Sequence, residues 1–114
     1  MNPRDGEIGE VLVALADPTR RMLLDVLAEE GRASATTLAG RLPVSRQAVV
    51  KHLQMLERAG LVTGGRTGRE VLYLVRPDRL DLSARWLARL ASNWERRLEA
   101  VKRAAESTGG EPEG

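Results

Sequence analysis

The sequence predicts a mostly α-helical domain with one two-stranded β-hairpin. Before Gly60, apolar residues recur every three or four positions between breaks at proline and glycine, which is typical of short helices. From Leu61 to Val75 the apolar period falls to two, as in strands. After Pro77 a helical pattern continues without proline or glycine from about Leu80 to Glu106.

The composition fits a single domain and excludes several kinds of chemistry. The chain has 114 residues, of which 42% are hydrophobic and 30% charged, so it suits one globular core. The absence of cysteine excludes disulfides, thiolate metal sites and a cysteine nucleophile, and one histidine cannot form a histidine-rich metal site. With neither an apolar leader nor a run of 18 apolar residues, we expect a cytoplasmic protein that makes no membrane contact.

Two helices open the predicted domain. The first covers 8–15 and has apolar residues along one side. Asp17 suits the N-cap of the second helix, because its carboxylate can accept hydrogen bonds from the N–H groups of the first turn. Pro18 suits the first helical position, where its missing N–H has no consequence, and Gly31 is typical of a helix end.

A third, short helix and a fourth helix follow in close succession. Ser34 and Ser45 suit the N-caps of these two helices, and Pro43 prevents the third from continuing. Only about three residues, 42–44, would separate the helices, so they must turn sharply on each other. This spacing is that of a helix-turn-helix.

The fourth predicted helix has one apolar and one polar face. His52 lies alone on the apolar face, where core packing or a hydrogen bond is a simpler interpretation than metal binding or catalysis. Arginine and lysine donate to guanine, glutamine pairs with adenine, and valine contacts the thymine methyl group, so the polar face could read bases. The alternative is an ordinary solvent-facing surface. The polar face consists of Arg46, Gln47, Val50, Lys51 and Gln54.

The predicted hairpin has strands at Leu61–Gly65 and Glu70–Val75. Its tip carries Arg66 and Arg69 among glycines, where they could reach phosphates or a narrow minor groove; the alternative is two solubilising charges. The glycine-rich segment 64–68 precedes a strand rather than a helix, so we do not interpret it as a phosphate-binding loop.

The last predicted helix is longer than one small domain needs. At 1.5 Å per residue it would extend roughly 40 Å, and its apolar side requires a partner. Trp86 and Trp94 are expected to pack the helix on that partner; a ligand pocket beside them is the alternative. Residues 1–6 and 107–114 are small and polar, with glycine and proline, so we expect them to be disordered around a domain at 7–106.

Positive charge is concentrated in one third of the chain. Residues 41–76 contain seven basic and two acidic residues, a net charge of +5, whereas the remainder has eleven basic and fourteen acidic residues, a net charge of −3. This asymmetry suits a polyanionic partner, although a solvated face would have the same composition.

The predicted order of helices, helix-turn-helix, basic-tipped hairpin and long helix is that of a winged helix-turn-helix DNA-binding domain. Four segments make the pattern more specific: LADPTRRMLLDVL (15–27), VSRQAVVKHLQMLERAGLV (44–62), GREVLYLV (68–75) and ARWLARLASNWERRL (84–98). Through these segments the chain resembles the ArsR family of bacterial repressors, and the resemblance covers nearly its whole length. It implies a homodimer, joined mainly through the first and last helices, that represses transcription by binding an imperfect palindrome in double-stranded DNA.

Two sets of candidate site residues follow from the pattern and the resemblance together. The threonines at the start of the third helix could hold a phosphate through hydroxyl and N–H groups, and Ser45 could combine a helix cap with a phosphate contact. The DNA-binding set is Thr36, Thr37, Ser45, Arg46, Gln47, Val50, Lys51, Gln54, Arg66 and Arg69. The dimer-interface set is Ile8, Val11, Leu12, Leu15, Trp86, Leu87, Leu90, Trp94, Leu98 and Val101.

The chain departs from the metal-sensing members of the family it resembles. One type has a cysteine pair near Thr36 to Leu38, where this chain has ATTLAG, and the other uses aspartate and histidine on the last helix, which has no histidine here. The resemblance therefore favours the metal-independent branch, whose members often repress their own operon. We expect no metal and no cofactor, and the sequence identifies no inducer.

Two other functions remain open at this stage. Winged helices also serve as protein-interaction modules, and a repressor of this kind can respond to a small ligand at the dimer interface. An enzyme is the least favoured class, because no carboxylate pair, no nucleophile with a base and no phosphate-binding loop is convincingly placed.

Overall fold

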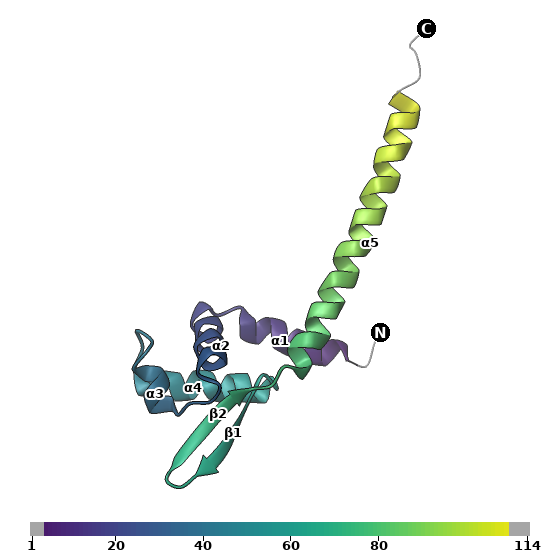
Figure 1. Cartoon of the computed structure of the whole chain (residues 1–114). Helices are drawn as coiled ribbons and strands as arrows, with labels where there is room; N and C mark the ends of the chain where they lie inside the picture. Colours follow the sequence, from purple (N-terminus) through teal and green to yellow (C-terminus); the bar gives the residue numbers. More distant parts are fainter. Residues whose placement is uncertain (1–3, 110–114) are drawn as a thin grey trace. The chain divides into compact units, whose positions relative to one another are not determined.

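The computed structural model describes residues 4–109, which form the mostly helical fold with one hairpin that the sequence predicts (Figure 1). The chain divides into two units, residues 1–83 and 84–114. Among the described residues, no helix is long and apolar enough to cross a membrane. The elements in chain order are α1 (Asp5–Leu15), α2 (Pro18–Glu30), α3 (Ala35–Ala39), α4 (Arg46–Arg58), β1 (Val62–Thr67), β2 (Glu70–Val75) and α5 (Asp78–Gly109).

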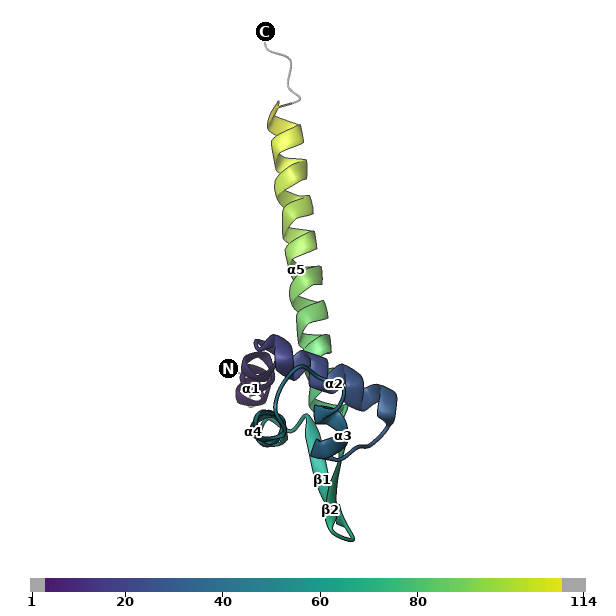
Figure 2. The same ribbon diagram turned by 90° about the vertical axis from the view of Figure 1, so that its left-hand side faces the viewer.

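The core of the first unit is aliphatic and lies between the helices and the base of the hairpin. Helix α2 contacts α1, α3, α4 and β2, so it is the central element of this core. Helix α1 runs alongside α4, and the two are seen nearly end-on in Figure 2. The largest fully buried side chains are Leu23, Leu27, Leu38, Leu53, Leu56, Leu61, Val11, Val49 and Val62.

Helix α2 begins and ends at the residues that the sequence predicts. Asp17 is the N-cap, and its Oδ1 accepts hydrogen bonds from the N–H groups of Thr19 at 2.7 Å and Arg20 at 3.2 Å. Pro18 occupies the first helical position. Gly31 ends the helix with a φ of 83°, a backbone conformation that glycine adopts without a steric penalty.

Arg20 joins α1, α2 and α4, although the sequence does not distinguish it from the arginine that follows. Its side chain is buried, with Nε donating to the carbonyl oxygen of Ala14 at 2.7 Å and Nη2 to that of Val13 at 3.3 Å. Its Nη1 lies 3.4 Å from Sδ of Met55 and 3.8 Å from Oδ2 of Asp17. The guanidinium therefore binds carbonyl groups at the C-terminal end of α1, where the helix supplies too few N–H groups to satisfy them; the carbonyl of Val13 also accepts the N–H of Ala16 at 3.2 Å.

The Asp17 cap makes stability depend on pH. Burial alone would raise the pKa of Asp17, but the N–H groups of Arg20 and Thr19, together with nearby positive charge, hold it below its ordinary value. A lowered pKa stabilises the fold above about pH 4, and this stabilisation is lost as the pH falls through the folded-state value. We expect Asp17→Ala to lower Tm by about 5 °C at pH 7. The difference from the wild type should shrink below pH 4 in thermal melts; a constant difference would contradict the charged-cap account.

The connection between α3 and α4 is longer than the sequence indicated. Ser34 and Ser45 are the N-caps, as predicted, but α3 ends at Ala39, so residues 40–45 link the helices where 42–44 were expected. After Ala39 the chain tightens, because the N–H of Arg41 binds the carbonyl three residues earlier at 3.0 Å. Leu42 still reaches the core, but from a turn rather than from the helix.

The loop of the hairpin, in contrast, is shorter than predicted. Strand β1 runs from Val62 to Thr67 instead of Leu61 to Gly65, and it pairs with β2 in an antiparallel register from Val62↔Val75 to Thr67↔Glu70. Only Gly68 and Arg69 lie between the strands, with φ at 64° for Gly68. A positive φ at the first of two turn residues suits a type II′ turn, which matches the twist of paired strands.

The outer helices extend beyond the predicted domain bounds of 7–106. Helix α1 begins at Asp5, since Asp5 and Glu7 place negative charge in its first turn, and Arg4 pairs with Glu7 at 3.3 Å. Helix α5 continues to Gly109, because no proline interrupts it. The expected disordered segments, 1–6 and 107–114, otherwise lie outside the described residues.

Candidate nucleic-acid interface

The polar face of α4 is largely exposed to solvent. Arg46, Gln47, Lys51 and Gln54 are exposed, while the opposite face supplies fully buried residues to the core. Val50 is half-buried and packs against the core, so only part of its side chain remains available to a partner. The helix thus presents polar and basic groups on a rigid support, as base recognition requires.

Ser45 and Thr37 serve first as local caps. Oγ of Ser45 accepts the N–H of Ala48 at 3.1 Å, and Oγ of Ser34 accepts the N–H of Thr37 at 3.1 Å. Oγ of Ser34 also donates to Oγ1 of Thr37 at 3.2 Å. Since Ser45 acts as an acceptor here, its hydroxyl hydrogen stays free to donate to a phosphate.

Helix α3 supports the first arginine of α4. Nε of Arg46 donates to Oγ1 of Thr36 at 3.0 Å, so two predicted site residues ten positions apart are brought into contact. Both side chains are exposed. The Thr36 hydroxyl thereby orients the guanidinium and leaves its two terminal nitrogens free for a partner.

A surface hollow connects α4 to the hairpin. Its wall includes Thr36, Arg46 and Val50 from the helices, and Arg69 and Tyr73 from the hairpin. The predicted arginine of the turn therefore faces the same hollow as the start of α4. Arg66 is exposed on β1 and does not line the hollow.

Tyr73 fixes the hairpin to the helices, a role that the sequence analysis missed. Its backbone pairs with Ala33, through N–H to carbonyl distances of 2.8 and 3.0 Å in the two directions. Its ring covers Gly64, its cross-strand partner, where an added Cβ would lie 2.9 Å from the ring. The available signal was Gly64, because a glycine inside a strand often marks a close approach.

Ion pairing separates the basic residues of the segment 41–76 into two groups. Arg41 binds Glu29 at 2.9 Å and Glu30 at 2.7 Å, and these hydrogen bonds raise its pKa. Arg76 lies 3.7 Å from Asp78. Within residues 4–109, the remaining five have no carboxylate partner: Arg46, Lys51, Arg58, Arg66 and Arg69. Four of these five belong to the predicted DNA-binding set.

The predicted dimer-interface residues of α1 have two different environments. Ile8 is 5% exposed and Val11 is fully buried, so both belong to the core of one protomer and have almost no surface to offer to a second copy. Leu15 is half-buried against the same core. Leu12 is 39% exposed and is the one member of the α1 set with substantial free surface.

The predicted interface residues of α5 are mostly exposed. Trp86 is half-buried, whereas the others are 40–60% exposed. An exposed apolar stripe of this length is unusual for a monomer and is typical of a contact surface. The exposed residues are Leu87, Leu90, Trp94, Leu98 and Val101.

The described part of the chain holds no group of three histidine, cysteine, aspartate or glutamate residues that could bind a metal ion. His52 is half-buried on the inner side of α4, and its buried Nδ1 has no hydrogen-bond partner there.

Comparison with known proteins identifies the family. A family model described as a helix-turn-helix domain matches residues 15–64. The structure is similar to an ArsR-like transcriptional regulator from Rhodococcus sp. RHA1, with a TM-score of 0.79 and 45% identity over 90% of this chain and 95% of the other. The chain belongs to the ArsR family. It is therefore a winged helix-turn-helix, DNA-binding transcriptional regulator rather than an enzyme.

Two further relatives of this ArsR-family regulator bear on its activity and assembly. The repressor SmtB of Mycobacterium tuberculosis is 46% identical over 65 residues, which cover 57% of this chain and 47% of SmtB. The domain of Mb0332 from Mycobacterium bovis is described as a homodimeric winged helix-turn-helix DNA-binding domain. It has 26% identity and a TM-score of 0.62 over 82% of this chain and 88% of that domain.

Proposed function

We propose that this ArsR-family regulator is a homodimeric repressor that blocks transcription by occupying a palindromic operator. The observation that carries the proposal is a set of four cations on α4 and the hairpin that have no carboxylate partner within residues 4–109: Arg46, Lys51, Arg66 and Arg69. Phosphate neutralisation by such groups supplies much of the affinity for DNA.

The recognition step is assigned to α4 in the major groove. Arg46 and Lys51 donate to guanine or to phosphates, and the two glutamines of the same face pair with adenine. Val50, being half-buried, offers a smaller contact to a thymine methyl group. Thr36, Thr37 and Ser45 contribute phosphate contacts beside them.

The hairpin is assigned to the DNA flanking the major-groove contact. Arg69 lies at the turn, and Arg66 lies three residues before Arg69, on β1; both are exposed. Arginine at such a tip reaches phosphates or a narrow minor groove, whose negative potential attracts it. The backbone pairing of Tyr73 with Ala33 keeps the hairpin fixed to the helices for this contact.

Dimerisation is assigned to the apolar stripe of α5, together with Leu12 of α1. This stripe is exposed in one protomer, and the related Mycobacterium bovis domain is a homodimer. A two-fold pair places two recognition helices in successive major grooves, about 34 to 36 Å apart. The residues of the two metal-sensing sites described above are absent, which supports a regulator that acts without a metal.

The proposal is tested by titrating the protein against the duplex upstream of its own gene and against a scrambled duplex, at several salt concentrations. We expect selective binding to the first duplex. The logarithm of the binding constant should fall with the logarithm of salt concentration with a slope of about −7, if all eight cations of the dimer neutralise phosphates. Equal and weak binding to both duplexes would favour a protein-interaction module or an operator elsewhere.

A further inference from the structure

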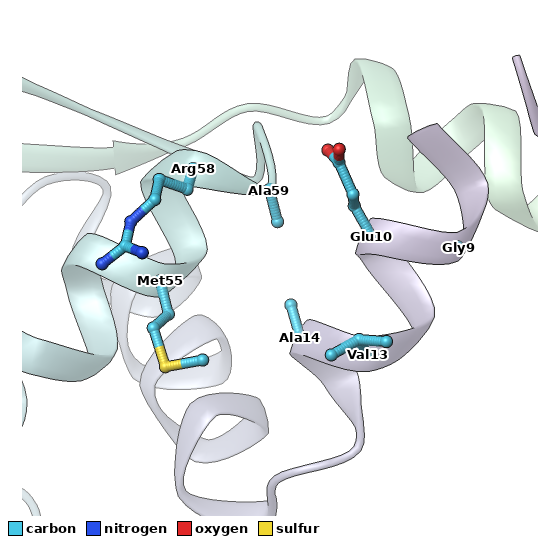
Figure 3. A pocket seen from close by; sticks show the side chains of 7 residues that line it. All are labelled: Gly9, Glu10, Val13, Ala14, Met55, Arg58 and Ala59. Carbon is cyan, nitrogen blue, oxygen red and sulfur yellow. The ribbon is translucent and has the colours of Figure 1, made fainter. Parts of the chain in front are cut away.

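A groove between α1 and α4 lies apart from the residues assigned to DNA binding (Figure 3). Its volume is about 680 Å³, within the range of about 300 to 1,000 Å³ that small-molecule sites occupy. We call it the α1–α4 groove. Its side chains are Glu10, Val13 and Ala14 from α1, Met55 and Arg58 from α4, and Ala59, the C-cap of α4.

The interior of the α1–α4 groove is apolar, and small side chains form its floor. Ala14 on α1 and Ala59 at the C-cap of α4 are buried, and their small volume leaves the space open. Val13 is 66% exposed and Met55 is 40% exposed on the two walls. An apolar body placed between them would remove both side chains from water.

The charges at the edges of the groove favour an anion. In Figure 3, Glu10 and Arg58 lie at opposite edges. The carboxylate of Glu10 already accepts a hydrogen bond from Nη1 of Arg79 at 3.0 Å. Arg58 has no carboxylate partner within residues 4–109. The charge left uncompensated at the groove is therefore positive.

Arg20 holds both walls of the groove in place. It donates to the carbonyl oxygens of Val13 and Ala14 on α1, and its Nη1 lies 3.4 Å from Sδ of Met55 on α4. The groove is therefore formed before any occupant arrives, which reduces the entropy cost of binding.

We propose that the α1–α4 groove binds one amphipathic organic anion per protomer, such as a medium-chain carboxylate. The hydrocarbon body lies on Val13, Ala14 and Met55, and the anionic group lies on Arg58. The α5 helix of a second copy is a poorer occupant, since residues 84–109 carry six basic and three acidic residues and would bring net positive charge to Arg58. The groove shares α4 with the DNA-reading face, so its role as an effector site rests on the proposed function.

The test follows the methionine methyl groups by NMR, in dimeric protein carrying ¹³C-methyl methionine and titrated with decanoate. We expect a saturable shift of the Met55 methyl signal, with one decanoate bound per protomer. The signal of Met22, exposed on α2 outside the groove, should stay in place. Decyltrimethylammonium, which has the same chain and the opposite charge, should bind at least about tenfold more weakly.

Two variants locate the binding site. Arg58→Ala should weaken decanoate binding about tenfold, whereas the matched control Arg32→Ala removes an exposed arginine of the same unit and should have no effect. Val13→Asp should abolish binding, because it places a negative charge on the apolar wall. Val13 is exposed and its side chain makes no hydrogen bond, so this variant should still fold.

Several results would overturn the proposal. One is that the Met55 methyl signal does not shift. Another is that the cationic and anionic probes bind equally, and a third is that Arg58→Ala leaves the affinity for decanoate unchanged. A Met55 shift confined to a monomeric variant would also overturn it, by showing that the second copy fills the groove. The titration uses free protein, so decanoate binding combined with no selective DNA binding would reject the proposed function and leave the groove assignment standing.

Discussion

Replacing both Arg46 and Lys51 with alanine is expected to weaken operator binding about a thousandfold. Each side chain has an exposed cationic group without a carboxylate partner in the described chain, and a homodimer loses four such contacts. At about 1 kcal/mol for each contact, the loss is about 4 kcal/mol. Titration of the variant against the wild-type operator duplex at fixed salt measures it directly.

A matched control separates recognition from overall charge. Arg32→Ala with Lys102→Ala removes two exposed cations that lie outside both proposed contact surfaces, so its affinity should stay within about threefold of the wild type. Full affinity in the Arg46 and Lys51 variant would remove α4 from the interface. The winged helix would then be better explained as a module that docks to another protein.

The contact with Thr36 is the reason for including Arg46 in the double alanine variant. The Thr36 hydroxyl accepts Nε of Arg46 at 3.0 Å, which limits the positions that the guanidinium can take. The sequence placed both residues at the start of helices and assigned each a contact with DNA, but it did not predict that they touch. The contact depends on how the chain turns between α3 and α4, where the predicted end of α3 was wrong.

Local rules predicted the features of the fold that depend on neighbouring residues. Asp17, Ser34 and Ser45 cap helices because each side chain reaches an N–H group two or three residues ahead. The end of α3 was missed because it depends on Leu42 entering the core from a turn, a tertiary effect. Arg20 and its neighbour Arg21 look alike in the sequence, and only packing shows that Arg20 is the buried one.

Long-range pairing decided which charged residues remain available. The sequence showed an excess of positive charge in 41–76, but not that Arg41 is bound by Glu29 and Glu30 on α2. For the same reason it could not separate Leu12, which keeps free surface, from Val11, which is buried in the core. The apolar side of a short helix has the same appearance whether it faces a core or a second protomer.

Substituting glutamate for both Trp94 and Leu98 is expected to produce a monomer. The two side chains are 55% and 60% exposed in one protomer, so the change should leave the protomer folded and act on the proposed contact between copies. Two carboxylates per protomer would have to be buried without partners in the dimer, which is strongly unfavourable. Light scattering during size-exclusion chromatography measures the mass, and operator affinity should fall at least about a hundredfold, because one protomer makes only half of the contacts.

The appropriate control places the same two charges elsewhere on α5. Ser92→Glu with Asn93→Glu changes two exposed polar positions outside the apolar stripe, so it should remain dimeric and bind the operator with less than about a tenfold loss. If the Trp94 and Leu98 variant were monomeric and kept its full affinity, the two-fold account would be contradicted, because one recognition helix would then suffice for the whole operator.

If the Trp94 and Leu98 variant stayed dimeric, the copies would have to meet away from α5. In that case the exposed stripe would need a different partner, and the two-helix spacing would have to be derived from another contact.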